Sequence, residues 1–157
     1  MAGQIEDHSD LFNPQHFFHQ ISLTVRFGDI DSLGHVNHAK YLTYMEQGRA
    51  CYVRDVCGWD GNFLKLGMIL ARASVDYLLP LHFNETVYVL TRCSRLGNKS
   101  FDLAYLIQRE KDGQREMVAT AVTNMVAYEY ASQQSIAVPD TWREKILAFE
   151  PALEAKS

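Results

Sequence analysis

The chain has 157 residues, of which 47% are hydrophobic and 22% are charged, with 9 Gly and 4 Pro. This length suits one compact domain, and the composition excludes collagen-like, low-complexity and wholly disordered chains. The formal net charge of −4 argues against a general nucleic-acid binder, and no apolar run approaches the roughly 20 residues of a membrane span. We therefore expect one globular domain with no nucleic-acid partner and no membrane span.

The first residues and the cysteines indicate the compartment. No Lys or Arg precedes Arg26 and no apolar core follows Met1, so a secretory signal is not expected. Ala2 stands where N-myristoylation requires glycine. The 3 cysteines form no C-x-x-C pair, which favours buried thiols in a reducing environment over disulfides or a zinc site. We expect a cytoplasmic protein without a metal.

The first predicted elements are an arm, a strand and a long helix. Residues 1–18 are polar and lack a clean period, which predicts a loose N-terminal arm. Residues 20–27 alternate between polar and apolar, which predicts a half-buried strand whose inward set is Ile21, Leu23, Val25 and Phe27. A turn at 28–34 follows. Apolar residues then recur at three- and four-residue steps, which predicts a helix from an Asn37 N-cap to a stop at Gly58.

The rest of the chain predicts strands and a closing helix. The strands are expected at residues 68–78, 85–96, 99–109 and 116–128. Gly97-Asn98 is a hairpin signal, and Thr141 and Glu144 have capping-box spacing in a helix over 139–149. Both alternating sets of the 99–109 strand contain apolar residues, so we expect material packed on each face of the sheet. The domain is expected over 19–150, between the arm and a C-terminal tail at 151–157.

This order of elements indicates an α+β architecture. One long helix precedes four antiparallel strands, and its apolar circumference is too wide for a helix lying on a surface. A ferredoxin-like fold would need a second helix between strands. A curved sheet wrapped around the central helix satisfies the burial demand, which is the hot-dog fold. A cystatin-like curved sheet is the alternative.

The chemistry is concentrated just before the long helix. Asp31 lies in the predicted turn, and Gly34 allows a ligand to approach the backbone. The first helical turn leaves N–H groups unpaired, and the helix dipole adds partial positive charge there. A carboxylate and oxyanion donors are the two parts needed to hydrolyse an acyl derivative. Asp31 would attack a thioester carbonyl directly or take a proton from water.

Each of these residues also has a structural interpretation. Capping the turn is as good an account of Asp31 as catalysis, and Asp29 is better explained as a structural carboxylate. His35 and His38 could bind a metal with these aspartates, but no third ligand of known spacing supports it. Tyr41 is most simply a core residue. Glu46 borders the apolar face of the predicted helix, and its i,i+3 spacing to Arg49 predicts a salt bridge.

Several segments together resemble a known family. The matching motifs are V-R-F-G-D-I-D at 25–31, G-H-V-N-H at 34–38, Y-L-x-Y-x-E-x-x-R at 41–49, V-D-Y-L-L-P at 75–80 and R-L-G-N-K-S-F at 95–101. In order and spacing they resemble the 4-hydroxybenzoyl-CoA thioesterase family of the hot-dog superfamily. The resemblance runs from about residue 21 to residue 128. It implies hydrolysis of an acyl-CoA, with CoA as part of the substrate and no further cofactor.

The resemblance also implies residue roles. Asp31, the second aspartate of D-x-D, matches the catalytic carboxylate, and His38 matches the position whose backbone N–H polarises the thioester. The expected substrate contacts are Gly34, His35, Asn37 and Tyr41. The residues expected to meet the CoA phosphates are Arg95, Lys99 and Ser100. Family members are homodimers or homotetramers with sites at subunit interfaces. The chain has Asn37-His38 where Asn-Asn is commoner.

Two other functions compete with acyl-CoA hydrolysis. A hot-dog dehydratase or hydratase uses the same fold, but its His-Phe-Pro-Gly type of loop has no counterpart in this sequence. A non-catalytic protein that binds acyl-CoA or acyl-carrier protein is the other alternative.

Overall fold

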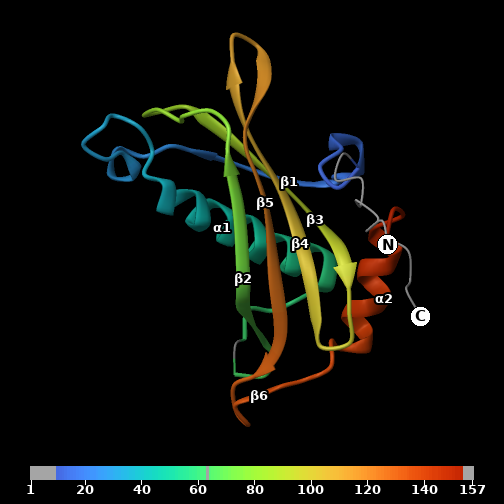
Figure 1. Ribbon diagram of the computed structural model, residues 1–157. Coiled ribbons are helices and arrows are strands. Elements are labelled where there is room, and N and C mark those ends of the chain that lie inside the picture. Colours follow the sequence, from blue (N-terminus) through green and yellow to red (C-terminus); the bar gives the residue numbers. More distant parts are fainter. Residues whose placement is uncertain (1–9, 63, 154–157) are drawn as a thin grey trace, which may run out of the picture.

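The computed structural model describes residues 10–62 and 64–153. A six-stranded antiparallel sheet has the order β1-β3-β4-β5-β2, with β6 paired to β5 (Figure 1). The strands are β1 (His19–Thr24), β2 (Gly67–Tyr77), β3 (Thr86–Leu96), β4 (Ser100–Lys111), β5 (Gln114–Glu129) and β6 (Gln134–Ser135). The helices are α1 (His38–Cys57), α2 (Asp140–Phe149) and the 3₁₀ turns η1 (Pro14–His16) and η2 (Phe27–Asp29). A curved sheet around one long helix, predicted from the element order, is confirmed.

Local signals determine both ends of α1. The Asn37 side chain accepts a hydrogen bond from the Ala39 N–H at 2.9 Å, which caps the first turn. Gly58 ends the helix in the left-handed conformation at φ 72°, and its N–H reaches back to the Arg54 carbonyl. Both boundaries agree with the prediction. No helix among the described residues is long and apolar enough to cross a bilayer.

The core lies between α1 and one face of the sheet. Tyr41, Met45 and Tyr52 of α1 are at most 3% exposed. The alternate β4 side chains Phe101, Leu103, Tyr105 and Ile107 belong to the same buried cluster. Each such side chain contributes about 1.5–3 kcal/mol by leaving water. Apolar side chains recur every 3.6 residues in α1 and every two residues in β4, so the two sets face each other and form one continuous interface.

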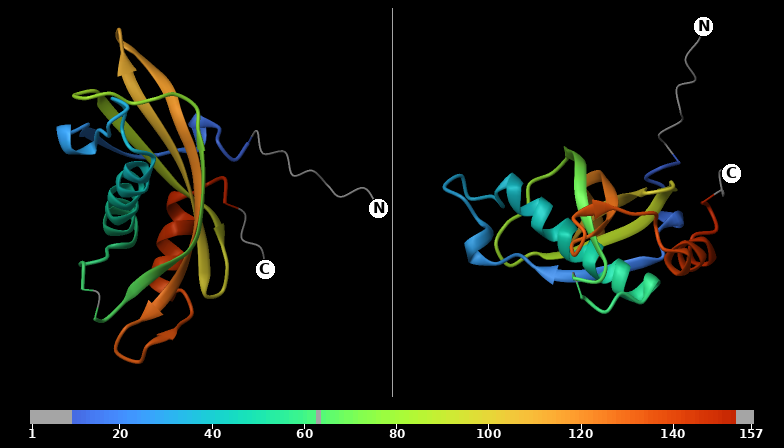
Figure 2. Two further views of the ribbon diagram at one scale, coloured as in Figure 1. Left: turned by 60° about the vertical axis from the view of Figure 1, so that its left-hand side comes forward. Right: turned by 90° about the horizontal axis from the view of Figure 1, so that it is seen from below.

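The opposite face of the sheet is covered by the arm. Phe17 is 8% exposed and packs with Leu90, Ala104 and Leu106 on β3 and β4. The arm and α1 lie on opposite sides of the sheet (Figure 2). Packing on both faces was predicted and is confirmed, but the predicted loose arm is wrong for residues 10–18. Residues 1–9 of that arm and 154–157 of the predicted tail lie outside the described residues.

Two predicted local features do not form. The first strand ends at Thr24, and Phe27, expected to point inward, is 78% exposed in η2. The cause is Asp29, whose carboxylate accepts the Arg26 N–H at 3.0 Å and turns the chain. At α2 the Thr141–Glu144 capping box is absent, because the N-cap residue is Pro139, which has no polar side chain.

The closing helix is tied to the core by a buried carboxylate. Glu150 is 2% exposed and accepts hydrogen bonds from the Tyr52 hydroxyl at 2.6 Å and the Cys93 N–H at 3.0 Å. Burial raises the pKa of Glu150, although both hydrogen bonds favour the ionised form. Cys51, Cys57 and Cys93 are buried free thiols, as predicted.

Close contact between α1 and β3 predicts a cost for a single methyl group at Gly48. A Cβ there would lie 2.7 Å from Val89 Cγ1 and 3.1 Å from Thr91 Oγ1. We expect Gly48→Ala to lower the free energy of unfolding by about 1–3 kcal/mol in urea titrations, despite its better helix propensity. Gly28→Ala is the control, because nothing lies within 4 Å of its Cβ. Equal midpoints for both variants would contradict this packing.

Candidate active site

A tight turn positions Asp31 before α1. The Asp31 N–H donates to the His35 carbonyl at 3.0 Å, and the Gly34 N–H donates to the Asp31 carbonyl at 3.0 Å. Gly34 has φ 82°, a conformation that favours glycine. Ile30 and Val36 form a β-bridge that closes the loop. The turn therefore holds Asp31 directly beside His35.

The Asp31 carboxylate has one occupied and one free oxygen. Its Oδ1 accepts the Leu33 N–H at 2.9 Å, which is the turn-capping interaction that the sequence allowed. Within residues 10–62 and 64–153, no ion pair involves Asp31 and no hydrogen bond reaches its Oδ2. The side chain is partly exposed. Capping and chemistry are therefore compatible, because the cap leaves one oxygen available.

One N–H group at the start of α1 remains available. The Asn37 side chain occupies the Ala39 N–H, and the Lys40 N–H donates to the Asn37 carbonyl at 2.8 Å. The Asn37 N–H donates to the Asp29 carbonyl at 2.9 Å. Among the described residues, the His38 N–H has no acceptor. Of the oxyanion donors expected from the first turn, the His38 N–H is thus the one left unbonded, because the Asn37 cap accepts the neighbouring Ala39 N–H.

A cavity of about 320 Å³ opens at this helix start. It is lined by His35, Val36, His38, Tyr41, Tyr77, Leu78, Leu79 and Pro80. Three of the predicted site residues, His35, His38 and Tyr41, meet there. Asp31 and Gly34 lie on the adjoining turn, and Asn37 serves as the helix cap. Apart from the two histidines the lining is apolar or aromatic, which suits the acyl part of a small ligand.

Tyr77 is a cavity residue that sequence reasoning missed. Its hydroxyl donates to the His38 carbonyl at 3.0 Å, and its ring stands edge-on to Tyr41 with centroids 5.0 Å apart. Burial raises the pKa of Tyr77, which keeps the hydroxyl protonated as a donor. The Tyr41 hydroxyl in turn reaches the Leu79 carbonyl at 3.4 Å. These contacts fix β2 and its following loop against the first turn of α1.

Asp29 has the structural role that its sequence interpretation favoured. It is 2% exposed and accepts the Tyr44 hydroxyl at 2.7 Å and the Arg26 N–H at 3.0 Å. Burial opposes ionisation, but these two hydrogen bonds and the Arg26 charge outweigh it and lower the pKa of Asp29. The residue ties η2 to α1 and does not enter the cavity.

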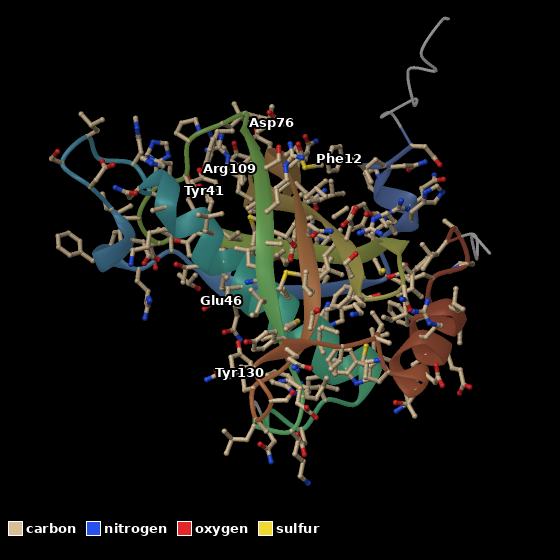
Figure 3. All side chains as sticks on the ribbon, turned by 60° about the horizontal axis from the view of Figure 1, so that its bottom comes forward. Phe12, Tyr41, Glu46, Asp76, Arg109 and Tyr130 are labelled. Atoms are coloured by element: carbon tan, nitrogen blue, oxygen red, sulfur yellow. The ribbon has the colours of Figure 1, made fainter. Side chains whose placement is uncertain are left out.

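The predicted salt bridge between Glu46 and Arg49 does not form. Arg49 is 8% exposed and turns into the core, where Nη1 donates to the Tyr105 hydroxyl at 3.2 Å. Glu46 stays exposed on the outer side of α1 (Figure 3).

The metal site considered for His35 and His38 has no ligand cluster behind it among the residues that the structure describes. The ring of His35 packs edge-on against the ring of His82, with centroids 5.2 Å apart. No cluster of potential metal ligands occurs in the described part of the chain.

The expected CoA-contacting residues lie at the far end of the sheet. Ser100 pairs with Val126, which pairs with Ile69, whereas the cavity residue Tyr77 lies eight residues further along β2. At about 3.3 Å per residue this separation is about 26 Å. Arg95 is moreover neutralised, since Nε and Nη2 donate to the Asp102 carboxylate at 2.8 and 3.0 Å. One chain therefore does not bring Arg95, Lys99 and Ser100 to the helix start.

Comparison with known proteins identifies the family. Residues 25–146 match the model of the Thioesterase-like superfamily, and the chain belongs to this family. It is 25% identical over 137 residues to the long-chain acyl-CoA thioesterase FadM of Escherichia coli (strain K12), covering 81% of this chain and 96% of that protein. This membership agrees with the resemblance found in the sequence and with the hot-dog fold.

Solved structures give the same result for the fold. The PA2801 protein from Pseudomonas aeruginosa is 30% identical, with a TM-score of 0.75 over 83% of this chain and 98% of that one. A 4-hydroxybenzoyl-CoA thioesterase has a TM-score of 0.75 at 17% identity, over 81% of this chain and 96% of that one. The second likeness concerns the fold alone.

The contacts of Asp29 predict a pH-dependent loss of stability. Asp29→Asn removes the charge from two hydrogen bonds, which should lower the free energy of unfolding by about 1.5–3 kcal/mol at pH 7. Because the folded-state pKa is below the ordinary 3.8, the carboxylate stabilises the fold above that value. The difference between wild type and variant should therefore vanish as pH falls through the lowered pKa. Denaturant titrations from pH 2.5 to 7 measure it, with Asp31→Asn as control; a difference independent of pH would contradict this role.

Proposed function

We propose that this protein hydrolyses the thioester bond of an acyl-CoA to a free acid and CoA. The observation that carries the proposal is the presence of three features around the start of α1, with Asp31 on the turn that adjoins the cavity rather than in its lining. They are the free oxygen of Asp31, the unbonded N–H of His38 and an apolar cavity of about 320 Å³. Membership of the Thioesterase-like superfamily and the similarity to an acyl-CoA thioesterase support the same reaction.

The chemistry assigns one task to each feature. The cavity, walled by His35, Tyr41 and Tyr77, receives the acyl group beside α1. The thioester oxygen accepts the His38 N–H, and the helix dipole stabilises the negative charge that develops on it. The free oxygen of Asp31 then attacks the carbonyl carbon to give an anhydride that water opens, or it takes a proton from the attacking water. In both routes the C–S bond breaks: CoA leaves as a thiolate that takes a proton from solvent after direct attack, or receives from Asp31 the proton that Asp31 took from water.

Asp31→Asn tests the carboxylate directly. The amide keeps an oxygen that can cap the Leu33 N–H, but it is neither a base nor an effective nucleophile. We expect thiol release from a panel of acyl-CoAs to fall by about a hundred-fold or more, with the thermal midpoint nearly unchanged. The control is Asp112→Asn, in the β4–β5 turn, which should retain full activity.

The same panel separates the competing functions. Undiminished hydrolysis by Asp31→Asn would remove this residue from the chemistry. Binding of acyl-CoA by the wild type without thiol release would favour the non-catalytic alternative. Addition of water to an enoyl-CoA would favour the hydratase.

We further propose that the working unit is a dimer joined along β2. This strand pairs only with β5, so its other edge is unpaired among the described strands. Ile69 and Leu70 on it are 38% and 43% exposed, an unusual amount for apolar side chains of a long edge strand. Antiparallel pairing about a two-fold axis would set the Ile69 end of one strand beside the Tyr77 end of the other. Lys99 and Ser100 would then approach the cavity of the opposite protomer.

Lys99→Ala tests this arrangement. The Lys99 side chain is exposed at the hairpin end and could bind a CoA phosphate in the dimer. We expect KM for acyl-CoA to rise about ten-fold while kcat stays within about two-fold, because the phosphate contact is the same in ground and transition states. Lys111→Ala, at the opposite end of β4, is the charge-matched control. An unchanged KM would exclude Lys99 from the CoA site.

A further inference from the structure

A second and larger cavity lies on the other face of the sheet. Its volume is about 720 Å³, against about 320 Å³ for the cavity at α1. The arm residues Leu11 and Phe12 form one wall, and side chains of β2 form the opposite one. Figure 3 labels Asp76 at one end of β2, with Phe12 in the same part of the picture, whereas Glu46 of α1 is labelled further down. Nothing in the proposed hydrolysis uses this space.

Packing of the arm and the pairing of β2 hold the walls of this second cavity, here called the outer cavity, in place. Phe17 anchors the arm by packing against Leu90 and Leu106, so the preceding Phe12 is held over the sheet. On β2, an irregularity in the pairing lies between Leu70 and Arg72. Beyond it, alternate residues Arg72, Ser74 and Asp76 project to the cavity side. The outer cavity therefore lies at the border where the arm stops covering this face of the sheet.

The floor of the outer cavity is polar but internally satisfied. Arg95 donates to both oxygens of Asp102, and the Asn124 side-chain amide donates to Asp102 at 2.6 Å. The Arg95 guanidinium also reaches the Ser100 hydroxyl at 3.0 Å. This network is neutral and pre-formed, so it offers shape and hydrogen-bonding capacity without a net charge.

Two charged side chains of β2 remain without a partner. Within the described residues, neither the Arg72 side chain nor the Asp76 side chain makes a hydrogen bond or an ion pair. Four residues of extended strand place them about 13 Å apart. A fitting ligand therefore carries an anionic group at one end, a hydrogen-bond donor at the other and a flat apolar part between them that packs on Phe12.

We propose that the outer cavity binds an adenosine phosphate. Its phosphate would pair with Arg72, its purine would pack against Phe12, and the exocyclic amine of adenine would donate to Asp76. A ligand of this size suits a site of about 720 Å³. The same group occurs in free adenine nucleotides and at the end of CoA, so either could occupy the cavity.

Calorimetric titration of the protein tests whether an adenosine phosphate from either source binds. ADP, CoA, pantetheine and inorganic phosphate are titrated separately. We expect ADP and CoA to bind, and pantetheine and inorganic phosphate to bind at least ten-fold more weakly because they lack adenosine. ADP that competes with CoA at this site identifies a shared adenosine pocket. No heat from ADP up to 1 mM, or equal binding of inorganic phosphate, would overturn the proposal (about 4.1 kcal/mol corresponds to a Kd of 1 mM).

Three variants locate the binding. Arg72→Ala and Phe12→Ala should each weaken ADP binding about ten-fold, whereas Arg54→Ala on α1 should leave it unchanged. If the occupant is a free adenine nucleotide, KM for acyl-CoA should stay within two-fold in all three variants. A rise of KM in Arg72→Ala and Phe12→Ala, but not in Arg54→Ala, identifies the adenosine end of CoA as the occupant. Full ADP affinity in both cavity variants would overturn the assignment. A change of oligomeric state in Arg72→Ala, measured by light scattering, would instead make this face an interface between copies. The calorimetric result does not depend on whether the protein hydrolyses acyl-CoA.

Discussion

The buried carboxylate of Asp29 is the interaction on which the candidate site depends. Its side chain joins η2 to α1 through the Tyr44 hydroxyl, and its carbonyl accepts the Asn37 N–H. Asn37 in turn caps α1. The loop that carries Asp31 and the helix start that carries the His38 N–H are therefore parts of one hydrogen-bonded unit. Two aspartates separated by one residue divide the work, since Asp29 holds the loop and Asp31 keeps a free oxygen.

The second constraint is that both faces of the sheet centre are buried. Leu103 and Tyr105 of β4 face α1, while Ala104 and Leu106 face the arm. Both covers leave most of β2 exposed. The two cavities lie where the two covers end, one against the start of α1 and one against the arm. Incomplete coverage of a curved sheet thus leaves space for ligands on both of its faces.

Features encoded by neighbouring residues could be predicted from the sequence. The cap at Asn37 and the stop at Gly58 depend on backbone preferences within a few residues. A hairpin also forms where Gly97-Asn98 predicted one, but residues 97–99 connect its strands and neither Gly97 nor Asn98 has a positive φ. The fold class followed from the order of such elements, and the motif around Asp31 indicated the position of the site. Apolar residues in both alternating sets of β4 also predicted that both faces of the sheet would be covered, although they did not show which segment covers each face.

Features that depend on distant contacts could not be predicted. Tyr77 meets His38 across 39 positions of the chain, so no local pattern marks it as a cavity residue. The Glu46–Arg49 spacing favoured an ion pair, but the Tyr105 hydroxyl in the core offered Arg49 a buried partner. Phe17 is ordered by hydrophobic burial against β3 and β4. In each case tertiary packing outweighed a short-range preference.

The alternation along β2 has a consequence for how this strand can evolve. Asp76 and Tyr77 are consecutive, yet one belongs to the outer cavity and the other to the cavity at α1. Deleting or inserting one residue upstream would send each side chain to the face its neighbour now occupies. Such a one-residue register shift would place the Asp76 carboxylate against the start of α1 and the Tyr77 phenol against the arm. Substitutions in β2 that keep its length preserve this alternation, whereas a change of length alters the lining of both cavities at once.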